Sequence, residues 1–191
     1  MNTQLLTVRR APTARRPQRG SRRVHAAVGP ATFVLRPATR EDAPAIHALI
    51  EAHLAEGRLL PRSLAELTIH ASRFVVAVEQ SPRASSHPCV VGCAELAPLS
   101  PAVAEIRSLV VDQSARSLGV GKRLIAELRR AARREGFDRL CAFTHDAAYF
   151  VRKGFSIVPH HWVPEKIVRD CTGCAQFRRC GQHAVVLPLK G

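Results

Sequence analysis

The chain has 191 residues, 46% of them hydrophobic and 5% aromatic, which is enough for one α/β domain with a sizeable core. No apolar run approaches the roughly 20 residues that a membrane-spanning helix needs, so no transmembrane helix and no membrane partner are expected. A net charge of +14 would ordinarily suggest nucleic-acid binding, but the uneven distribution of that charge argues against it.

The excess positive charge is concentrated at the start of the chain. Residues 1–40 hold nine arginines and no Asp or Glu, whereas the other 20 basic residues are opposed by 15 acidic ones. Residues 1–31 also lack a hydrophobic period, so we expect a disordered Arg-rich arm. The alternative is a transit peptide over residues 1–26, because such peptides are Arg-rich and poor in acids. The expected location is therefore cytoplasmic, with a plastid or mitochondrion as the alternative.

The folded part begins with a strand and two helices. Residues 33–38 are typical of a strand, and residues 39–54 predict a helix with acids in its first turn and one apolar face. Gly57 ends this helix. Ser63 and Glu66 then have the spacing of a capping box, which predicts a short second helix.

Three strands are predicted next. Residues 74–79, 89–96 and 105–112 are apolar and rich in β-branched side chains. Residues 80–88 are polar and contain two prolines, which indicates a hairpin loop. A second turn at residues 98–101 leads into the third of these strands.

A glycine-containing loop separates that strand from the next helix. It reads Arg116-Ser-Leu-Gly119-Val-Gly121-Lys-Arg, and an amphipathic helix follows that stops at Gly136. Two glycines let the backbone turn tightly and let a ligand approach closely. Several free N–H groups then converge at the positive end of a helix dipole, which predicts a diphosphate site. The spacing is neither that of a P-loop nor that of a dinucleotide-binding fingerprint.

The rest of the chain alternates between strands and helices. Strands are predicted at residues 140–144, 154–158 and 184–189, with a short helix at residues 147–153. A loop-rich excursion over residues 159–183 precedes the last strand. The expected order is β-α-α-β-β-β-α-β-α-β, the excursion and a final strand.

The glycine loop resembles the acyl-CoA loop of the GNAT acetyltransferase superfamily. Arg116, Gly119 and Gly121 match its [Gln/Arg]-x-x-Gly-x-[Gly/Ala] motif position by position, and residues 149–155 resemble its aromatic helix that runs into Gly-Phe. The resemblance implies an α/β GNAT fold, with a mixed sheet of about seven strands and about four flanking helices. It also implies one domain over residues 32–191 and acetyl-CoA as co-substrate.

Within the superfamily the chain is similar to the short N-acetylglutamate synthases of arginine biosynthesis. The stretches that carry the similarity are Leu59–Ser63, Val91–Leu96, Ala104–Val111 and Pro164–Cys180. This implies direct acetyl transfer to the α-amine of L-glutamate. A GNAT enzyme that acts on another amine, such as a protein N-terminus, a polyamine or an aminoglycoside, is the alternative, and a homodimer is left open.

Acetyl transfer to an amine needs a carboxylate base, a weak acid near the sulfur and N–H donors for the oxyanion. Glu105 is the candidate base, because it lies four residues before Leu109 on the strand expected to flank the thioester and matches the synthases' proposed base. Thr144 matches a hydroxyl proposed there as general acid. The usual GNAT acid is a tyrosine where this chain has Phe150, and Tyr149 is turned about 100° from that position on a helix. Tyr149 is therefore a further candidate acid, and a solvated glutamate and an ordinary strand-end threonine are the structural alternatives for the other two.

The remaining predictions concern binding. An amino-acid substrate with two carboxylates needs cations, and Arg62 and then Arg107 are the candidates because a guanidinium can hold a carboxylate through two hydrogen bonds. Either arginine could instead be a solvated surface residue. The expected cofactor-binding residues are Leu109, Val110, Val111, Arg116, Ser117, Leu118, Gly119, Val120, Gly121, Lys122 and Phe150.

The six cysteines fall into two groups. Cys89, Cys93 and Cys141 lie in strand-like runs, where a free thiol behaves as a small hydrophobe, and this usage suits a reducing compartment. The other three could be zinc ligands with a histidine as the fourth, but their spacing fits no common zinc module. A compact loop without metal is therefore expected, with a reversible disulfide as an alternative. A nucleic-acid-binding module with a zinc knuckle is the remote alternative. The residues concerned are Cys171, Cys174, Cys180, His160, His161 and His183.

Overall fold

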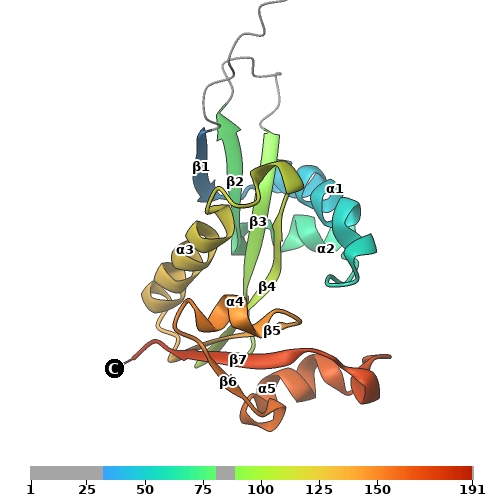
Figure 1. Cartoon of the computed structure of the whole chain (residues 1–191), viewed down its shortest axis with the longest axis vertical. Coiled ribbons are helices and arrows are strands. Elements are labelled where there is room, and N and C mark those ends of the chain that lie inside the picture. The colour runs from blue at the N-terminus through green and yellow to red at the C-terminus, as the bar shows by residue number, and fades with distance from the viewer. Residues whose placement is uncertain (1–31, 81–88, 191) are drawn as a thin grey trace, which may run out of the picture. The chain divides into compact units, whose positions relative to one another are not determined.

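The computed structural model describes residues 32–80 and 89–190 (Figure 1). The predicted arm and most of the predicted hairpin loop lie outside these residues. No helix in the described ranges is both long and apolar enough to cross a bilayer.

The predicted order of elements is confirmed, and the strand boundaries agree within two residues. The strands are β1 (Thr32–Pro37), β2 (Phe74–Gln80), β3 (Cys89–Pro98), β4 (Val103–Val111), β5 (Arg139–Thr144), β6 (Ser156–Val158) and β7 (His183–Pro188). The α-helices of the described part are α1 (Ala43–His53), α2 (Leu64–Ile69), α3 (Val120–Arg134), α4 (Ala147–Val151) and α5 (Pro164–Lys166).

The excursion differs from its loop-rich prediction because it contains a helix. Pro164 occupies the first turn of α5, where its missing N–H costs nothing, and Glu165 adds an acid there. A π-helical turn, Ile167–Cys171, continues α5. Side chains four residues apart along this segment therefore share one face.

The strands form a seven-stranded mixed sheet in the order β1-β2-β3-β4-β5-β7-β6, as predicted for an α/β fold with a mixed sheet of about seven strands. All neighbours are antiparallel except β4 and β5. These two pair only where Val103, Ala104 and Glu105 face Arg139, Leu140 and Cys141. The sheet therefore opens into a gap beyond Glu105.

Helices cover both faces of the sheet (Figure 1). Successive residues of β2 point to opposite faces, so Val75 packs in the cluster that contains α3, whereas Val76 packs in the cluster that contains α1. The buried residues of α3 recur at helical spacing and form one apolar face. They are Val120, Leu124, Ile125, Leu128 and Ala132.

Candidate active site

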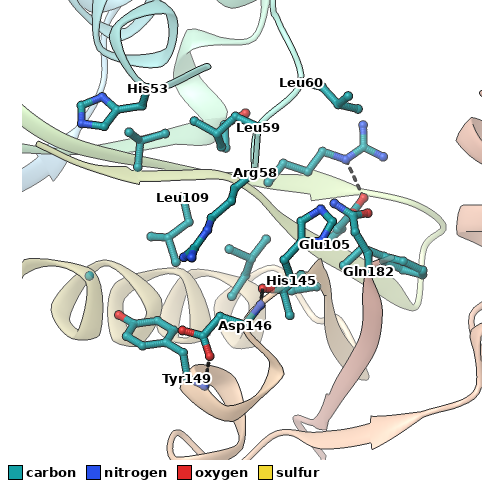
Figure 2. A pocket seen from close by; sticks show the side chains of 18 of the residues that line it. His53, Arg58, Leu59, Leu60, Glu105, Leu109, His145, Asp146, Tyr149 and Gln182 are labelled. Atoms are coloured by element: carbon teal, nitrogen blue, oxygen red, sulfur yellow. Dashed lines mark hydrogen bonds and ion pairs between the residues drawn. The ribbon is translucent and has the colours of Figure 1, made fainter. Parts of the chain in front are cut away.

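A cavity of about 1150 Å³ lies where β4 and β5 separate. Five segments line it: β4 from Glu105 onward, the loop before α3, the end of β5 with α4, the linker between α1 and α2, and the turn that follows α5. Figure 2 shows side chains from β4, from the linker between α1 and α2, and from the end of β5 with α4 around a common space. The cavity is thus the candidate active site.

The N-terminus of α3 forms one end of this cavity. Gly119 is its N-cap with a φ of 79°, and it has no side chain to cap the helix. The first helical hydrogen bond runs from the Arg123 N–H to the Gly119 carbonyl, at 3.1 Å. The N–H groups before Arg123 therefore lack intrahelical acceptors and are available to an anion.

Close packing at Gly121 leaves no room for a side chain. A Cβ at this position would lie 2.5 Å from the Tyr149 hydroxyl oxygen. The glycine lets α4 lie against the start of α3, and together they wall this end of the cavity. The residues present fit the acyl-CoA cradle expected from the motif.

Ten of the eleven predicted cofactor-binding residues line the cavity. The exception is Leu118, which is 48% exposed to solvent. Arg116 lines it while its Nη2 contacts Glu56 at 2.6 Å and its Nε donates to the Val111 carbonyl at 3.1 Å. The arginine of the motif thus also braces the loop against β4.

A β-bulge shapes the part of β4 that faces the gap. Cys93 pairs with Val110 and Glu95 pairs with Arg107, so β4 has one more residue in this interval than β3. Ser108 has a φ of 47°, which is uncommon outside glycine. The bulge redirects the backbone of β4 next to the gap.

Glu105 lies at the opposite end of the cavity, in a network of charged side chains. It is only 3% exposed. Its Oε2 is 2.5 Å from Arg107 Nε, and its Oε1 is 2.8 Å from Lys166 Nζ. Asp170 closes the ring, because its Oδ2 contacts Arg107 and lies 2.9 Å from Lys166 Nζ. Two cations therefore face the buried carboxylate of Glu105.

A second network surrounds Arg62. Its Nη1 lies 2.9 Å from Glu95, which is 1% exposed, and 3.0 Å from the Ser108 hydroxyl. Its Nη2 lies 2.9 Å from Glu66. Burial alone would lower the pKa of Arg62. The hydrogen bond to Glu66 and the charge of Glu95 together raise it by more than burial lowers it, so the pKa lies above its ordinary value. The guanidinium is therefore a fixed positive charge in the cavity wall.

Both predicted substrate arginines thus line the cavity, and each is already bound to two carboxylates of the chain. The sequence analysis did not identify Glu66, Glu95 or Asp170 as partners of these arginines. The sequence contained one signal for such a partner. Glu95 lies in an otherwise apolar strand, where burial of an unpaired carboxylate would be costly, so a nearby cation could have been predicted. It also missed Arg58, which Figure 2 shows reaching into the cavity beside Leu109, and for which the described residues provide no carboxylate partner.

The candidate acids lie on the β5 side. Thr144 Oγ1 accepts a hydrogen bond from the Asp146 N–H at 3.0 Å. Burial, followed by the charge of Asp146, raises the pKa of the Tyr149 phenol. The phenol of Tyr149 lies at Gly121 and not at Glu105, and the two ends are visible in Figure 2. Phe150 is buried and packs edge-on against Tyr149 and Phe155.

The cysteines of the described residues are all free thiols. Within those ranges, no group of three His, Cys, Asp or Glu side chains is placed to hold a metal ion. Burial raises the pKa of Cys93 to about 12, with Arg62 opposing the shift. His160 is engaged elsewhere, since its Nε2 lies 2.8 Å from the Gln182 carbonyl oxygen.

Known proteins are similar to this chain in sequence and in fold. The acetyltransferase (GNAT) family model matches residues 41–155. An uncharacterised N-acetyltransferase of Chlorobaculum tepidum is 32% identical over 155 residues, which cover 81% of this chain and 96% of that relative. An amino-acid acetyltransferase of Neisseria meningitidis is 31% identical over 80% of this chain and 33% of its own length.

A solved structure of a related enzyme is also similar to this chain in fold and sequence. The N-acetylglutamate synthase of Neisseria gonorrhoeae, complexed with coenzyme A and N-acetyl-glutamate, superposes with a TM-score of 0.71 and 29% identity. The match covers 85% of this chain and 36% of the synthase, so the chain spans about a third of the length of either Neisseria protein. The family match and the Chlorobaculum relative cover most of the described domain, and the chain therefore belongs to the GNAT family of acetyltransferases.

Proposed function

We propose that this protein transfers the acetyl group of acetyl-CoA directly to the α-amine of a small amino acid, with L-glutamate as the first candidate. The observation that carries the proposal is one continuous cavity from the N-terminus of α3 to Glu105. One end offers free N–H groups to a diphosphate, and the other offers a buried carboxylate among guanidinium groups. Those are the two ends that amine acetylation needs.

The donor end suits acetyl-CoA, the acyl donor of this family. The start of α3 provides N–H groups for the diphosphate. Beyond Glu105 the edge of β4 is not paired with β5, so its N–H and C=O groups can bind the amide groups of the pantetheine arm as a neighbouring strand would. The thioester then lies beside the bulge of β4.

The chemistry follows from the residues around that point. Glu105 accepts a proton from the acceptor ammonium, directly or through a water. The amine forms the new C–N bond, an N–H of β4 near Leu109 stabilises the oxyanion, and the C–S bond breaks. Thr144 is the first candidate to return a proton to the sulfur, and Tyr149 is the second.

The acceptor assignment draws on the relatives and on the charge networks. The Neisseria meningitidis relative is an amino-acid acetyltransferase, and the Neisseria gonorrhoeae structure contains N-acetyl-glutamate. In this chain Glu66 and Asp170 are the more exposed partners of the two arginines, with side chains 42% and 29% exposed. We expect the two substrate carboxylates to replace Glu66 and Asp170 on the arginines. Arg62 would keep its ion pair with the buried Glu95, and Arg107 would keep its ion pair with the buried Glu105.

An assay of thiol release with a panel of amines tests this function. We expect kcat/KM to be highest for L-glutamate and lower for L-aspartate, L-glutamine, a polyamine and an N-terminal peptide. If folded protein releases no thiol with glutamate but does so with another amine, the glutamate assignment is wrong. A polyamine is the specific second candidate, because Glu66 and Asp170 could bind its ammonium groups.

A further inference from the structure

The cavity contains an amine that belongs to the protein itself. Lys166 lines the cavity, and its Nζ lies 2.8 Å from Oε1 and 2.9 Å from Oε2 of Glu105. Its side chain is only 15% exposed. The ammonium of Lys166 thus lies on the carboxylate proposed as the base for acetyl transfer.

This is the position that an acceptor amine has to reach. A general base acts on a proton within hydrogen-bonding distance, about 2.6–3.2 Å between heavy atoms, or through one water. Lys166 Nζ already meets that requirement and also lies 5.4 Å from the centroid of the Phe143 ring on β5. The Lys166 ammonium therefore lies between β4 and β5, at the start of the gap in which the thioester is proposed to bind.

The identity of the residue matters for the chemistry. The chain has 29 basic residues, and only Lys122, Lys153, Lys166 and Lys190 are lysines. An arginine at position 166 could keep the ion pairs with Glu105 and Asp170 but could not lose a proton to become a nucleophile. Lysine can do both. In a chain that uses arginine almost everywhere else, the amine on the proposed base is a lysine.

We propose that Lys166 is an autoacetylation site of this enzyme, an inference that rests on the proposed use of acetyl-CoA in the cavity. Lys166 Nζ gives a proton to Glu105 and attacks the thioester carbonyl carbon, so that a C–N bond forms and the C–S bond breaks. The sulfur leaves as a thiolate that takes up a proton. The products are Nε-acetyl-Lys166 and CoA, with one proton released to solvent. No oxidant or other co-reactant is needed.

The modification would change the charge of the acceptor end. The ring now contains two cations, Arg107 and Lys166, and two anions, Glu105 and Asp170. An acetamide carries no charge, so Arg107 alone would face both carboxylates. Autoacetylation and turnover of an amino acid therefore compete for the same base.

Incubation of the full chain with acetyl-CoA, without any acceptor, tests the inference. Intact mass and peptide mapping follow acetylation of each of the four lysines over time. We expect Lys166 to be labelled at least about tenfold faster than Lys190, because proximity to the base and the thioester replaces a bimolecular encounter. The first-order rate constant should not change with protein concentration, and CoA should slow it by competition.

Two conservative variants give the controls. K166R keeps the positive charge and should remove the fast acetylation, whereas K190R, which changes the lysine paired with Asp138 outside the cavity, should leave it unchanged. Equal labelling of Lys166 and Lys190 would show spontaneous surface chemistry and overturn the inference. If the same preparation acetylates an amino acid while Lys166 stays unlabelled, the inference fails and the proposed function stands. If it does neither, both fail.

Discussion

The two ends of the cavity are built by different means. At the donor end, a few consecutive residues around Gly119 present backbone N–H groups that lack intrahelical acceptors. At the acceptor end, β4, the linker before α2 and the excursion each supply charged side chains, and directly paired residues lie up to 63 positions apart. The donor end therefore depends on local backbone shape, whereas the acceptor end depends on mutual neutralisation of buried charges.

Loss of the base should have the largest effect. We expect E105Q to lower kcat by about 10²–10⁴, because glutamine keeps the shape but cannot take the proton. The control variant E127Q, at a residue of α3 that does not line the cavity, should leave kcat unchanged. Steady-state kinetics with thermal unfolding as a check on folding measure this. Activity of E105Q close to that of the unchanged protein would remove Glu105 from the base role.

Arg62 should matter for stability as well as for binding. R62M leaves Glu95 buried without a partner, which we expect to cost about 3–5 kcal/mol of unfolding free energy. The double variant R62M/E95M should recover most of that loss, since both charges are then gone. R58M is the matched control, because Arg58 is exposed, and it should change stability by less than about 0.5 kcal/mol. Denaturant unfolding decides, and equal losses for R62M and R58M would contradict the network.

A steric change at the donor end should act on cofactor binding. G121A places a methyl group 2.5 Å from the Tyr149 hydroxyl oxygen, and we expect the KM for acetyl-CoA to rise about tenfold, or about 1.4 kcal/mol. Adding Y149F should restore most of the affinity, because the next ring atom lies at 3.6 Å.

G119A provides the comparison within the same loop. No atom lies within 4 Å of its added Cβ, but Gly119 has a φ of 79°, so backbone strain is the expected cost and Y149F should not relieve it. Equal rescue of both variants would contradict the steric explanation. Y149F alone tests the acid role, since loss of the acid lowers kcat and leaves KM nearly unchanged.

The smallest expected effect is a shift in one pKa. The chain contains one tyrosine, so ultraviolet titration reports Tyr149 alone. We expect its pKa in the folded protein to lie above the value of about 10 in the unfolded chain, because burial and then Asp146 raise it. D146N should lower it part of the way and still cap α4 through the Tyr149 N–H.

The stability consequence has a definite sign. A phenol that holds its proton more tightly in the folded state contributes fully below the unfolded pKa, about 10, and the contribution is lost as pH rises through the folded pKa. The free energy of unfolding should therefore fall in this alkaline window, and by less in D146N. A folded pKa at or below the unfolded one would contradict the half-buried position of the phenol.

The donor end was predictable from the sequence for a physical reason. Gly119 and Gly121 have no side chain, which permits the positive φ of the first and the close packing at the second. The strand and helix on either side follow from local periodicity. Leu118 shows the limit of that reasoning, because the motif includes it while its side chain faces solvent. Glu105, Arg62 and Arg107 were also identified, but as free groups and not as paired ones.

By itself the sequence determined the order of elements, the GNAT family and the position of the glycine loop at the start of α3, since each depends on spacing along the chain. Only the tertiary structure decided which acid neutralises which base. The bulge in β4 sets the position of Glu95 relative to the arginines. The helical segment of the excursion brings Lys166 and Asp170 to the same end of the cavity. Pairing of buried charges depends on distances between segments remote in sequence, and no local pattern encodes those distances.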